Sequence, residues 1–181
     1  MRRVMIIGQP GSGKSTLARA IGEITHLPVF HMDQIHWMSG WKERSTLEKA
    51  RLVAEVEARE NWVFEGGYSK SWTNRSARAD TLIWIDIPLF TRSFRVLRRT
   101  ITQFGKTRLD LPDGCPERFS LEFYQWIWNT RKTGRDRPHR IYDSLPEGKA
   151  KYWLRSGVEM DQYISGLRQA AKLGNLGISH R

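Results

Sequence analysis

The sequence predicts a three-layer α/β fold in which helices flank a five-stranded parallel sheet. Short apolar runs at residues 4–7, 28–30, 62–64, 81–87 and 151–154 alternate with segments of helical character. Such alternation is typical of parallel sheets. The first run also leads through a glycine-rich turn directly into a helical pattern. The chain of 181 residues is long enough for a single domain with a substantial core.

The N-terminal elements are clearly patterned. Residues 4–7 form a continuous apolar run, which is typical of a central strand buried on both faces. From Lys14 to about Ile24, Leu17 and Ile21 share one helical face with Ile24. Residues 28–30 then predict a short second strand.

The middle of the chain contains one helix between two expected connections. Residues 31–44 are predicted to connect the second strand to this helix. Ser45 is expected to cap the helix, with Glu48 three residues later completing a capping box. After the third strand at residues 62–64, the polar and basic residues 68–79 predict an irregular connection.

Pro88 ends the fourth strand, and a strongly amphipathic helix follows. Its apolar positions are spaced by four and three residues and therefore share one face; they are Phe90, Phe94, Leu97, Ile101 and Phe104. The opposite face carries Arg92, Arg95 and Arg99, with Arg98 at its edge. One side of this helix is thus apolar and the other basic.

Residues 105–140 are rich in proline, glycine and charge, and we expect them to form an insert within one domain spanning residues 1–181. Residues 119–131 are predicted to be helical, and the aromatic residues there are expected to form a small core of the insert. These are Phe119, Phe123, Tyr124, Trp126 and Trp128. A last strand at 151–154 and a C-terminal helix marked by Met160 and Leu167 complete the chain.

Composition limits the classes of partner. The net charge of +11 favours polyanionic ligands: nucleotide phosphates, nucleic acid or acidic membrane surfaces. The single cysteine, Cys115, excludes an intramolecular disulfide and a multi-cysteine metal site. The N-terminal apolar run stops at Gly8, too early for a signal peptide, and no stretch approaches the length of a membrane span. We therefore expect a cytoplasmic protein without a membrane partner.

The most specific motif lies between the first strand and the first helix. Gly8, four further residues and then Gly13-Lys14-Ser15 match G-x-x-x-x-G-K-[ST], the phosphate-binding loop. Glycines let the backbone curl so that N–H groups point at phosphate oxygens, and the next helix adds its positive dipole end. Lys14 is expected to reach the β- and γ-phosphates, and the Ser15 hydroxyl to ligate Mg²⁺. The predicted nucleotide-binding residues of the motif are Gly8, Pro10, Gly11, Ser12, Gly13, Lys14, Ser15 and Thr16.

Three carboxylates follow predicted strands. Asp33, Glu65 and Asp86 lie at or just past the ends of the second, third and fourth strands. Ligands of parallel sheets bind beyond the carboxyl ends of the strands. We therefore expect these carboxylates to lie near the phosphate loop.

Together these motifs resemble the P-loop small-molecule kinases, which include the adenylate, cytidylate, shikimate and gluconate kinases. Within that superfamily the chain is most similar to the adenylate-kinase-like branch named for DNA topology modulation. The similarity rests on residues 33–37 (Asp-Gln-Ile-His-Trp), 65–69 (Glu-Gly-Gly-Tyr-Ser) and 114–118 (Gly-Cys-Pro-Glu-Arg). It covers nearly the whole chain and implies a P-loop NTPase fold in which residues 105–140 form a helical, arginine-rich lid.

The resemblance implies roles for two residues after the second strand. Asp33 matches the acid that faces the acceptor hydroxyl in small-molecule kinases, where it can orient or deprotonate that hydroxyl. His36 stands where adenylate kinases carry an arginine for the acceptor's phosphate and gluconate kinases a histidine. Shikimate kinases have a second acid two positions before the first, where this chain has His31.

Residues 65–70 align with the Asp-Gly-Phe-Pro-Arg segment of adenylate kinases. The alignment implies that Glu65 helps to hold Mg²⁺ through water and that Lys70 contacts the acceptor's phosphate. Gly66 and Gly67 would let the backbone approach substrate closely. They are also compatible with a tight turn at a strand end, and both interpretations can hold together.

The same resemblance assigns arginines to the donor side. Arg95 and Arg99 match two arginines that lie over the nucleotide base and phosphates, where a guanidinium stacks on a base and chelates phosphate. A closing lid excludes water and brings arginines to the transferring group. The candidates are Arg131, Arg135, Arg137 and Arg140, with Arg135 and Arg137 preferred. Arg155 falls where related kinases wrap the adenine with backbone.

The sequence thus predicts an ATP- and Mg²⁺-dependent phosphotransferase acting on a small acceptor, with a nucleoside monophosphate as one candidate. Two alternatives remain: a nucleotide-regulated nucleic-acid-binding protein that affects DNA topology, and a P-loop ATPase without a dedicated acceptor. Nucleic acid is the secondary partner because no recognisable nucleic-acid-binding motif is present. The identity of the acceptor and the oligomeric state stay open.

Overall fold

A computed structural model describes residues 1–174 of the chain. Within this range, no helix combines the length and the apolar character needed to cross a membrane. The elements are, in order, β1 (Arg3–Gly8), α1 (Lys14–Thr25), β2 (Val29–His31), α2 (Met32–His36), β3 (Trp37–Met38), the 3-10 turn η1 (Ser39–Trp41), β4 (Lys42–Glu43), α3 (Thr46–Ala58), β5 (Trp62–Glu65), α4 (Trp72–Arg78), β6 (Thr81–Ile85), α5 (Leu89–Thr102), α6 (Leu121–Asn129), α7 (Thr133–Ser144), β7 (Ala150–Leu154) and α8 (Gly157–Lys172).

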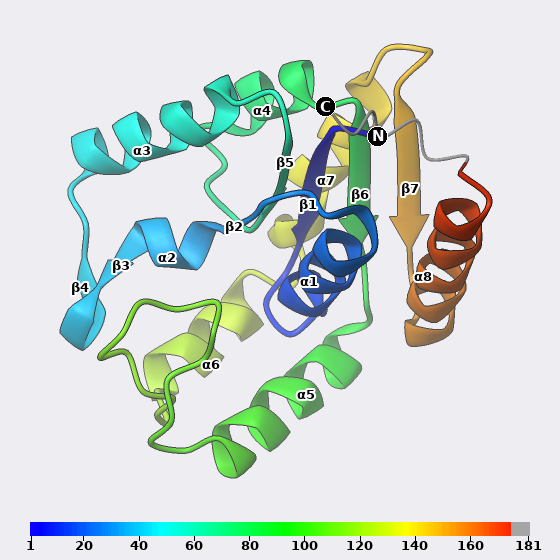
Figure 1. The fold of residues 1–181 in the computed structure, drawn as a ribbon. Helices are drawn as coiled ribbons and strands as arrows, with labels where there is room; N and C mark the ends of the chain where they lie inside the picture. The colour runs from blue at the N-terminus through cyan, green and yellow to red at the C-terminus, as the bar shows by residue number, and fades with distance from the viewer. Residues whose placement is uncertain (175–181) are drawn as a thin grey trace.

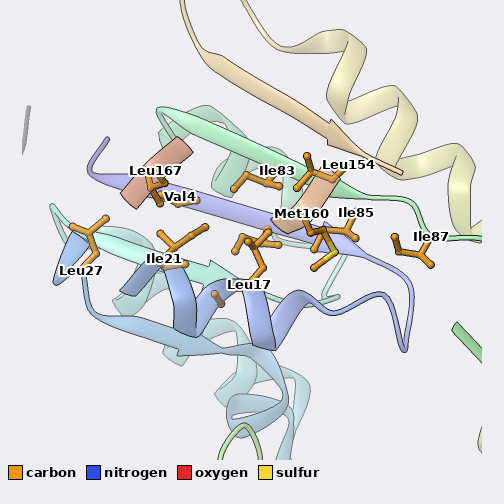
Figure 2. Close-up of a cluster of buried hydrophobic side chains, with 13 residues drawn as sticks. Val4, Leu17, Ile21, Leu27, Ile83, Ile85, Ile87, Leu154, Met160 and Leu167 are labelled. Atoms are coloured by element: carbon orange, nitrogen blue, oxygen red, sulfur yellow. The ribbon is translucent and has the colours of Figure 1, made fainter. Parts of the chain in front are cut away.

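Five strands form one sheet in the order β2-β5-β1-β6-β7 (Figure 1), and every neighbouring pair is parallel. Because successive side chains of a strand point to opposite faces, β1 contributes to two cores. Val4 and Ile6 pack with side chains of α1 and α8 (Figure 2). Met5 and Ile7 pack on the other face with side chains of α3, α4 and α7. The predicted three-layer fold with a five-stranded parallel sheet is confirmed.

The register of the sheet gathers the carboxyl ends of its strands at one edge. His31 at the end of β2 pairs with Glu65 at the end of β5, and Gly8 at the end of β1 pairs with Ile85 at the end of β6. The loops that carry the predicted site residues all leave the sheet from this edge. A ligand-binding site is expected there.

The structure differs from the sequence expectations in two connections. Residues 31–44 contain the short helix α2 and the β3–β4 hairpin. Residues 68–79 were expected to be irregular, and this expectation is wrong, because they contain α4. That segment has few apolar residues, but α4 buries Trp72 and the whole Arg75 side chain, so tertiary packing outweighs its polar composition.

Of the predicted capping box at the N-terminus of α3, the Ser45 hydrogen bond is present and the Glu48 side-chain bond is not. The Ser45 hydroxyl accepts a hydrogen bond from the Glu48 backbone N–H, as expected for an N-cap. The Glu48 carboxylate, however, binds the Arg44 guanidinium at 2.6 Å instead of completing a capping box.

Helix α5 is present as predicted, and it turns its apolar face to solvent. The exposed fractions are large for apolar residues: Phe90 84%, Phe94 65%, Leu97 42%, Ile101 69% and Phe104 66%. We call these five residues the apolar stripe. The opposite side of α5 is the buried one, and it carries Arg92, Val96 and Thr100. Contacts with the phosphate loop account for this orientation, as described below.

The insert at residues 105–140 contains α6 and the beginning of α7. Its aromatic side chains pair, with Phe119 stacked on Tyr124 and Phe123 on Trp126. The expected aromatic core is nevertheless wrong, because Trp126 is 51% exposed and the buried residue of α6 is Ile127. The aromatic residues of the insert therefore form surface pairs.

Candidate active site

The phosphate loop between β1 and α1 requires glycine at two points. Gly11 has a φ of 73°, and a Cβ there would lie 2.5 Å from the Arg92 carbonyl oxygen. Gly13, with a φ of 101°, caps α1 without a side-chain hydrogen bond, and the first turn of α1 holds no acidic residue. The N–H groups of this helix end are therefore available to an anion.

Arginines of α5 hold the loop through its carbonyl groups. Arg92 is 3% exposed, and it donates from Nη1 to the Pro10 carbonyl at 3.1 Å and from Nε to the Ile87 carbonyl at 3.0 Å. Arg95 Nη1 donates to the Ser12 carbonyl at 3.3 Å. These contacts explain why the basic side of α5 faces inward.

Arg95 lies where α5, the phosphate loop and the N-terminus of α8 meet. A Cβ added at Gly13 would lie 3.8 Å from its Nη1, and one added at Gly157 would lie 3.3 Å from its Nη2. Its guanidinium therefore lies between the loop and the N-terminus of α8. Arg155, just before that helix, is exposed, with its guanidinium 5.6 Å from the centre of the Trp153 ring.

The Ser15 hydroxyl lies at the centre of the site. Its oxygen is 3.0 Å from Glu65 Oε1 and 3.0 Å from Asp110 Oδ2. Glu65 Oε1 also lies 2.8 Å from His31 Nδ1. A hydroxyl has one hydrogen to donate, so only one of the two carboxylates can accept from Ser15 at a time. The predicted meeting of Ser15 and Glu65 is present, and a further carboxylate joins them.

Asp110 comes from the insert, and the sequence analysis did not find it. It is 3% exposed, and Arg108 Nη1 contacts its Oδ2 at 2.9 Å. Burial would raise the pKa of Asp110, but Arg108 and the hydrogen bond from Ser15 outweigh burial and hold that pKa below its usual value. No local pattern could have identified it, because Ser15 lies 95 positions away in the chain.

Asp33 lies on α2, directly after β2. Burial, and next the charge of Glu65, raise the pKa of Asp33 to about 6, while Lys14 and Arg108 act in the opposite direction. These influences place Asp33 near both the loop lysine and the insert. In this structure Lys14 Nζ donates to the Gln9 carbonyl at 3.2 Å, within its own loop.

His36 faces the β3–β4 hairpin. Its Nε2 lies 3.7 Å from Glu43 Oε1, and its ring packs against Trp37. Burial and then Lys49 lower the pKa of His36, with Glu43 opposing them. Its role in acceptor binding stays a prediction.

The two predicted glycines in the turn after β5 have different surroundings. A Cβ at Gly66 would lie 2.5 Å from Met32 Cβ, whereas no atom lies within 4 Å of a Cβ built at Gly67. Gly66 therefore allows the turn to pack against α2, and Gly67 borders open space. Lys70 is exposed three residues further on, and its substrate contact also stays a prediction.

Arg75 of α4 supports this turn from inside the protein. It is fully buried, donates to the Gly66 carbonyl at 3.2 Å and to Ser71 Oγ at 2.8 Å, and stacks on Phe64. Burial lowers the pKa of Arg75 to about 10, with Glu57 opposing that shift. Because the segment was expected to be irregular, Arg75 was not identified from the sequence.

The predicted lid arginines have different positions. Arg135 forms an ion pair with Asp86 at 2.5 Å, and Trp153 Nε1 lies 3.4 Å from the same carboxylate. Arg131 stacks on Trp128. Arg137 is exposed, and together with Arg140 it borders a hollow on the surface. Of the four, Arg135 is the one paired with a predicted strand-end carboxylate.

Arg99 binds the insert. Its Nη2 lies 3.2 Å from Glu117 Oε1, and Glu117 also contacts Arg108 Nε at 3.2 Å. This pairing attaches the segment that carries Asp110 to α5. Cys115 in the same segment is buried, and its thiol lies 3.2 Å from the Met38 carbonyl.

Comparisons with known proteins agree on the fold. No protein-family model matches the chain, and no curated protein matches it in sequence. Among solved structures, a shikimate kinase from Acinetobacter baumannii in complex with shikimate has a TM-score of 0.58 and 14% identity, covering 97% of this chain and 96% of that one. A shikimate kinase from Bacteroides thetaiotaomicron has a TM-score of 0.55 and 16% identity, covering 94% of this chain and 98% of that one. A putative kinase from Chloroflexus aurantiacus has a TM-score of 0.53 and 19% identity, covering 92% of this chain and 96% of that one. At these identities the likeness establishes a shared fold; the finer branch named for DNA topology modulation stays a prediction.

Proposed function

We propose that this protein is an ATP- and Mg²⁺-dependent phosphotransferase that moves the γ-phosphate of ATP to a small acceptor. The observation that carries the proposal is the meeting of the phosphate loop, the Glu65 turn and the Asp110 segment at the Ser15 hydroxyl. The fold shared with shikimate kinases supports it.

The donor half is formed by the loop. Its N–H groups and Lys14 would bind the phosphates of ATP, with Lys14 leaving the Gln9 carbonyl to do so. The donor set at Ser15, one hydroxyl flanked by the carboxylates of Glu65 and Asp110, fits Mg²⁺, which prefers hard oxygen ligands and substrate phosphates. When bound there, Mg²⁺ would neutralise charge on the β- and γ-phosphates. Within residues 1–174, no three His, Cys, Asp or Glu side chains form a metal site by themselves.

The acceptor half is centred on Asp33. With a pKa of about 6, its carboxylate would be largely ionised at neutral pH and could accept the proton of an acceptor hydroxyl. Positioning contributes most to phosphoryl transfer, so orienting that hydroxyl is its main task. Arg135 would supply positive charge from the lid side.

The test is phosphoryl transfer to a panel of nucleoside monophosphates and polyols. The purified protein is incubated with ATP and Mg²⁺, and mass spectrometry follows the phosphorylated acceptor and ADP. We expect Lys14→Ala to lower turnover at least about 100-fold, and Lys42→Ala, an exposed lysine of β4, to leave it unchanged. Transfer that survives Lys14→Ala would contradict the proposal. ADP formation without a phosphorylated product across the panel would favour the ATPase alternative.

A basic cleft favours nucleic-acid binding as a second candidate function. It measures about 580 Å³ and is lined by Arg131, Lys132, Arg135 and Arg140 beside Trp84 and Trp153. With a net charge of +11, DNA affinity should fall steeply with salt. A salt titration of DNA binding with and without ATP tests this candidate function. A DNA affinity that is the same with and without ATP would indicate nonspecific electrostatic attraction alone.

A further inference from the structure

The apolar stripe of α5 is an extended apolar surface that no other part of the described residues covers. Its five side chains are between 42% and 84% exposed, and α5 runs along one edge of the molecule (Figure 1). They expose about 600 Å² per chain. This equals the largest patch of an ordinary monomer, and patches of this size commonly mark interaction sites.

The stripe carries little charge although α5 contains four arginines. Arg92 and Arg95 bind carbonyl groups of the phosphate loop, and Arg99 binds Glu117. Of the four arginines, Arg98 is the one that is exposed. A helix lying on a lipid surface typically has a cationic face at the headgroups, and here three of the four arginines are turned into the protein.

The spacing of the stripe is that of a helix-packing seam. Phe90, Phe94, Leu97 and Ile101 follow one another within α5 at intervals of four, three and four residues, the a/d pattern of paired helices, and Phe104 continues the spacing just after the helix ends. The pattern is also nearly symmetric about Leu97. When two copies of α5 run antiparallel about Leu97, Leu97 meets Leu97 and Phe94 meets Ile101. Phe90 then comes beside the segment that follows α5 and carries Phe104.

We propose that the apolar stripe is the interface of a homodimer in which α5 packs antiparallel against α5 of a second copy. An interface of this kind is isologous, so a self-complementary stripe fits it. Covering the stripe on both copies would bury roughly 1,200 Å², the lower end of stable interfaces. The phosphate loop lies against the opposite side of α5, so both active sites stay open.

Salt distinguishes this partner from a polyanion. Each copy carries a charge of +11, so the two copies repel each other and screening should strengthen the dimer. Binding to an anionic lipid or to nucleic acid should weaken with salt.

The experiment is analytical ultracentrifugation of the full chain at low and high salt. The wild type is expected at twice its 21.2 kDa mass when concentrated, with a dissociation constant that falls as salt rises. Leu97→Asp, which places two like charges at the symmetry axis, should raise the dissociation constant at least about 100-fold. Leu47→Asp is the matched control, because Leu47 is 84% exposed on α3 and outside the stripe.

Disulfide cross-linking tests the antiparallel packing of α5 independently of the ultracentrifugation. Leu97→Cys should form a disulfide between copies on mild oxidation, whereas Leu47→Cys should not. The native Cys115 is buried and does not compete. A wild type that stays monomeric at about 100 µM, or a dimer unaffected by Leu97→Asp, would overturn the proposal. Monomers that bind phosphatidylserine vesicles through the stripe would overturn it in favour of a lipid surface.

Discussion

The two sides of the candidate active site are held together in different ways. The phosphate loop is built from neighbouring residues and fixed through the backbone, by the conformation of Gly11 and by arginine bonds to the Pro10 and Ser12 carbonyls. The side formed by residues 105–140, the proposed lid, is fixed by contacts between side chains, as between Ser15 and Asp110. We expect the loop to be preformed, and the lid contacts to depend on charge and on bound ligands.

Asp33 lies between the two sides, and its replacement should have the largest effect. Asp33→Asn removes the carboxylate that we propose orients the acceptor hydroxyl, so turnover should fall at least about 100-fold while ATP binding is kept. Steady-state kinetics and calorimetric titration of ATP separate these two quantities. A loss of ATP affinity as large as the loss of turnover would place Asp33 on the donor side instead.

The same substitution should stabilise the protein in a pH-dependent way. The pKa of Asp33 is raised from 3.8 to about 6 in the folded state, so ionised Asp33 costs stability. That cost is absent below pH 3.8, grows between pH 3.8 and 6, and is complete above pH 6. Asp33→Asn should therefore raise the free energy of unfolding by at most about 3 kcal/mol above pH 6, and this gain should vanish near pH 4. Denaturant unfolding in EDTA measures it, and a gain independent of pH would point to a cause other than ionisation.

Asp110 tests whether the insert contributes to the donor site. Asp110→Asn should raise the Mg²⁺ concentration for half-maximal activity about 10-fold and weaken Mn²⁺ binding in the presence of ADP, measured by electron paramagnetic resonance. ATP binding in EDTA should be unchanged. Asp113→Asn is the matched control, since Asp113 is exposed in the same segment. Equal Mn²⁺ affinity in both variants would remove Asp110 from the metal site.

The features that the sequence predicted are those decided by local pattern. The apolar runs gave the strands, and the motif gave the phosphate loop with Lys14 and Ser15. Glu65 could be placed beside Ser15 because both follow parallel strands, whose carboxyl ends meet. Each of these inferences needs only a short segment and a rule of sheet geometry.

What could not be predicted depends on partners distant in sequence. The spacing of α5 shows which residues share a face, but the side that turns inward is chosen by the carbonyl groups of the phosphate loop. Arg75 is buried against the Glu65 turn by a helix whose composition is polar. Asp110 meets Ser15 only after the insert folds back over the loop.

The ion pair between Asp86 and Arg135 should give the smallest effect and the sharpest test of the difference between loop and lid. Arg135 is 57% exposed at its side chain and Asp86 is 7% exposed, so solvent screens the pair and its coupling should stay below about 1 kcal/mol. A double-mutant cycle with Asp86→Asn and Arg135→Gln measures it, with thermal stability and the KM for ATP as readouts. We expect the coupling to disappear at high salt, because exposed charges are screened. Coupling that persisted at high salt would mean that the proposed lid is fixed as firmly as the phosphate loop, and the two sides of the site would then differ only in whether backbone carbonyls or side chains make the contacts.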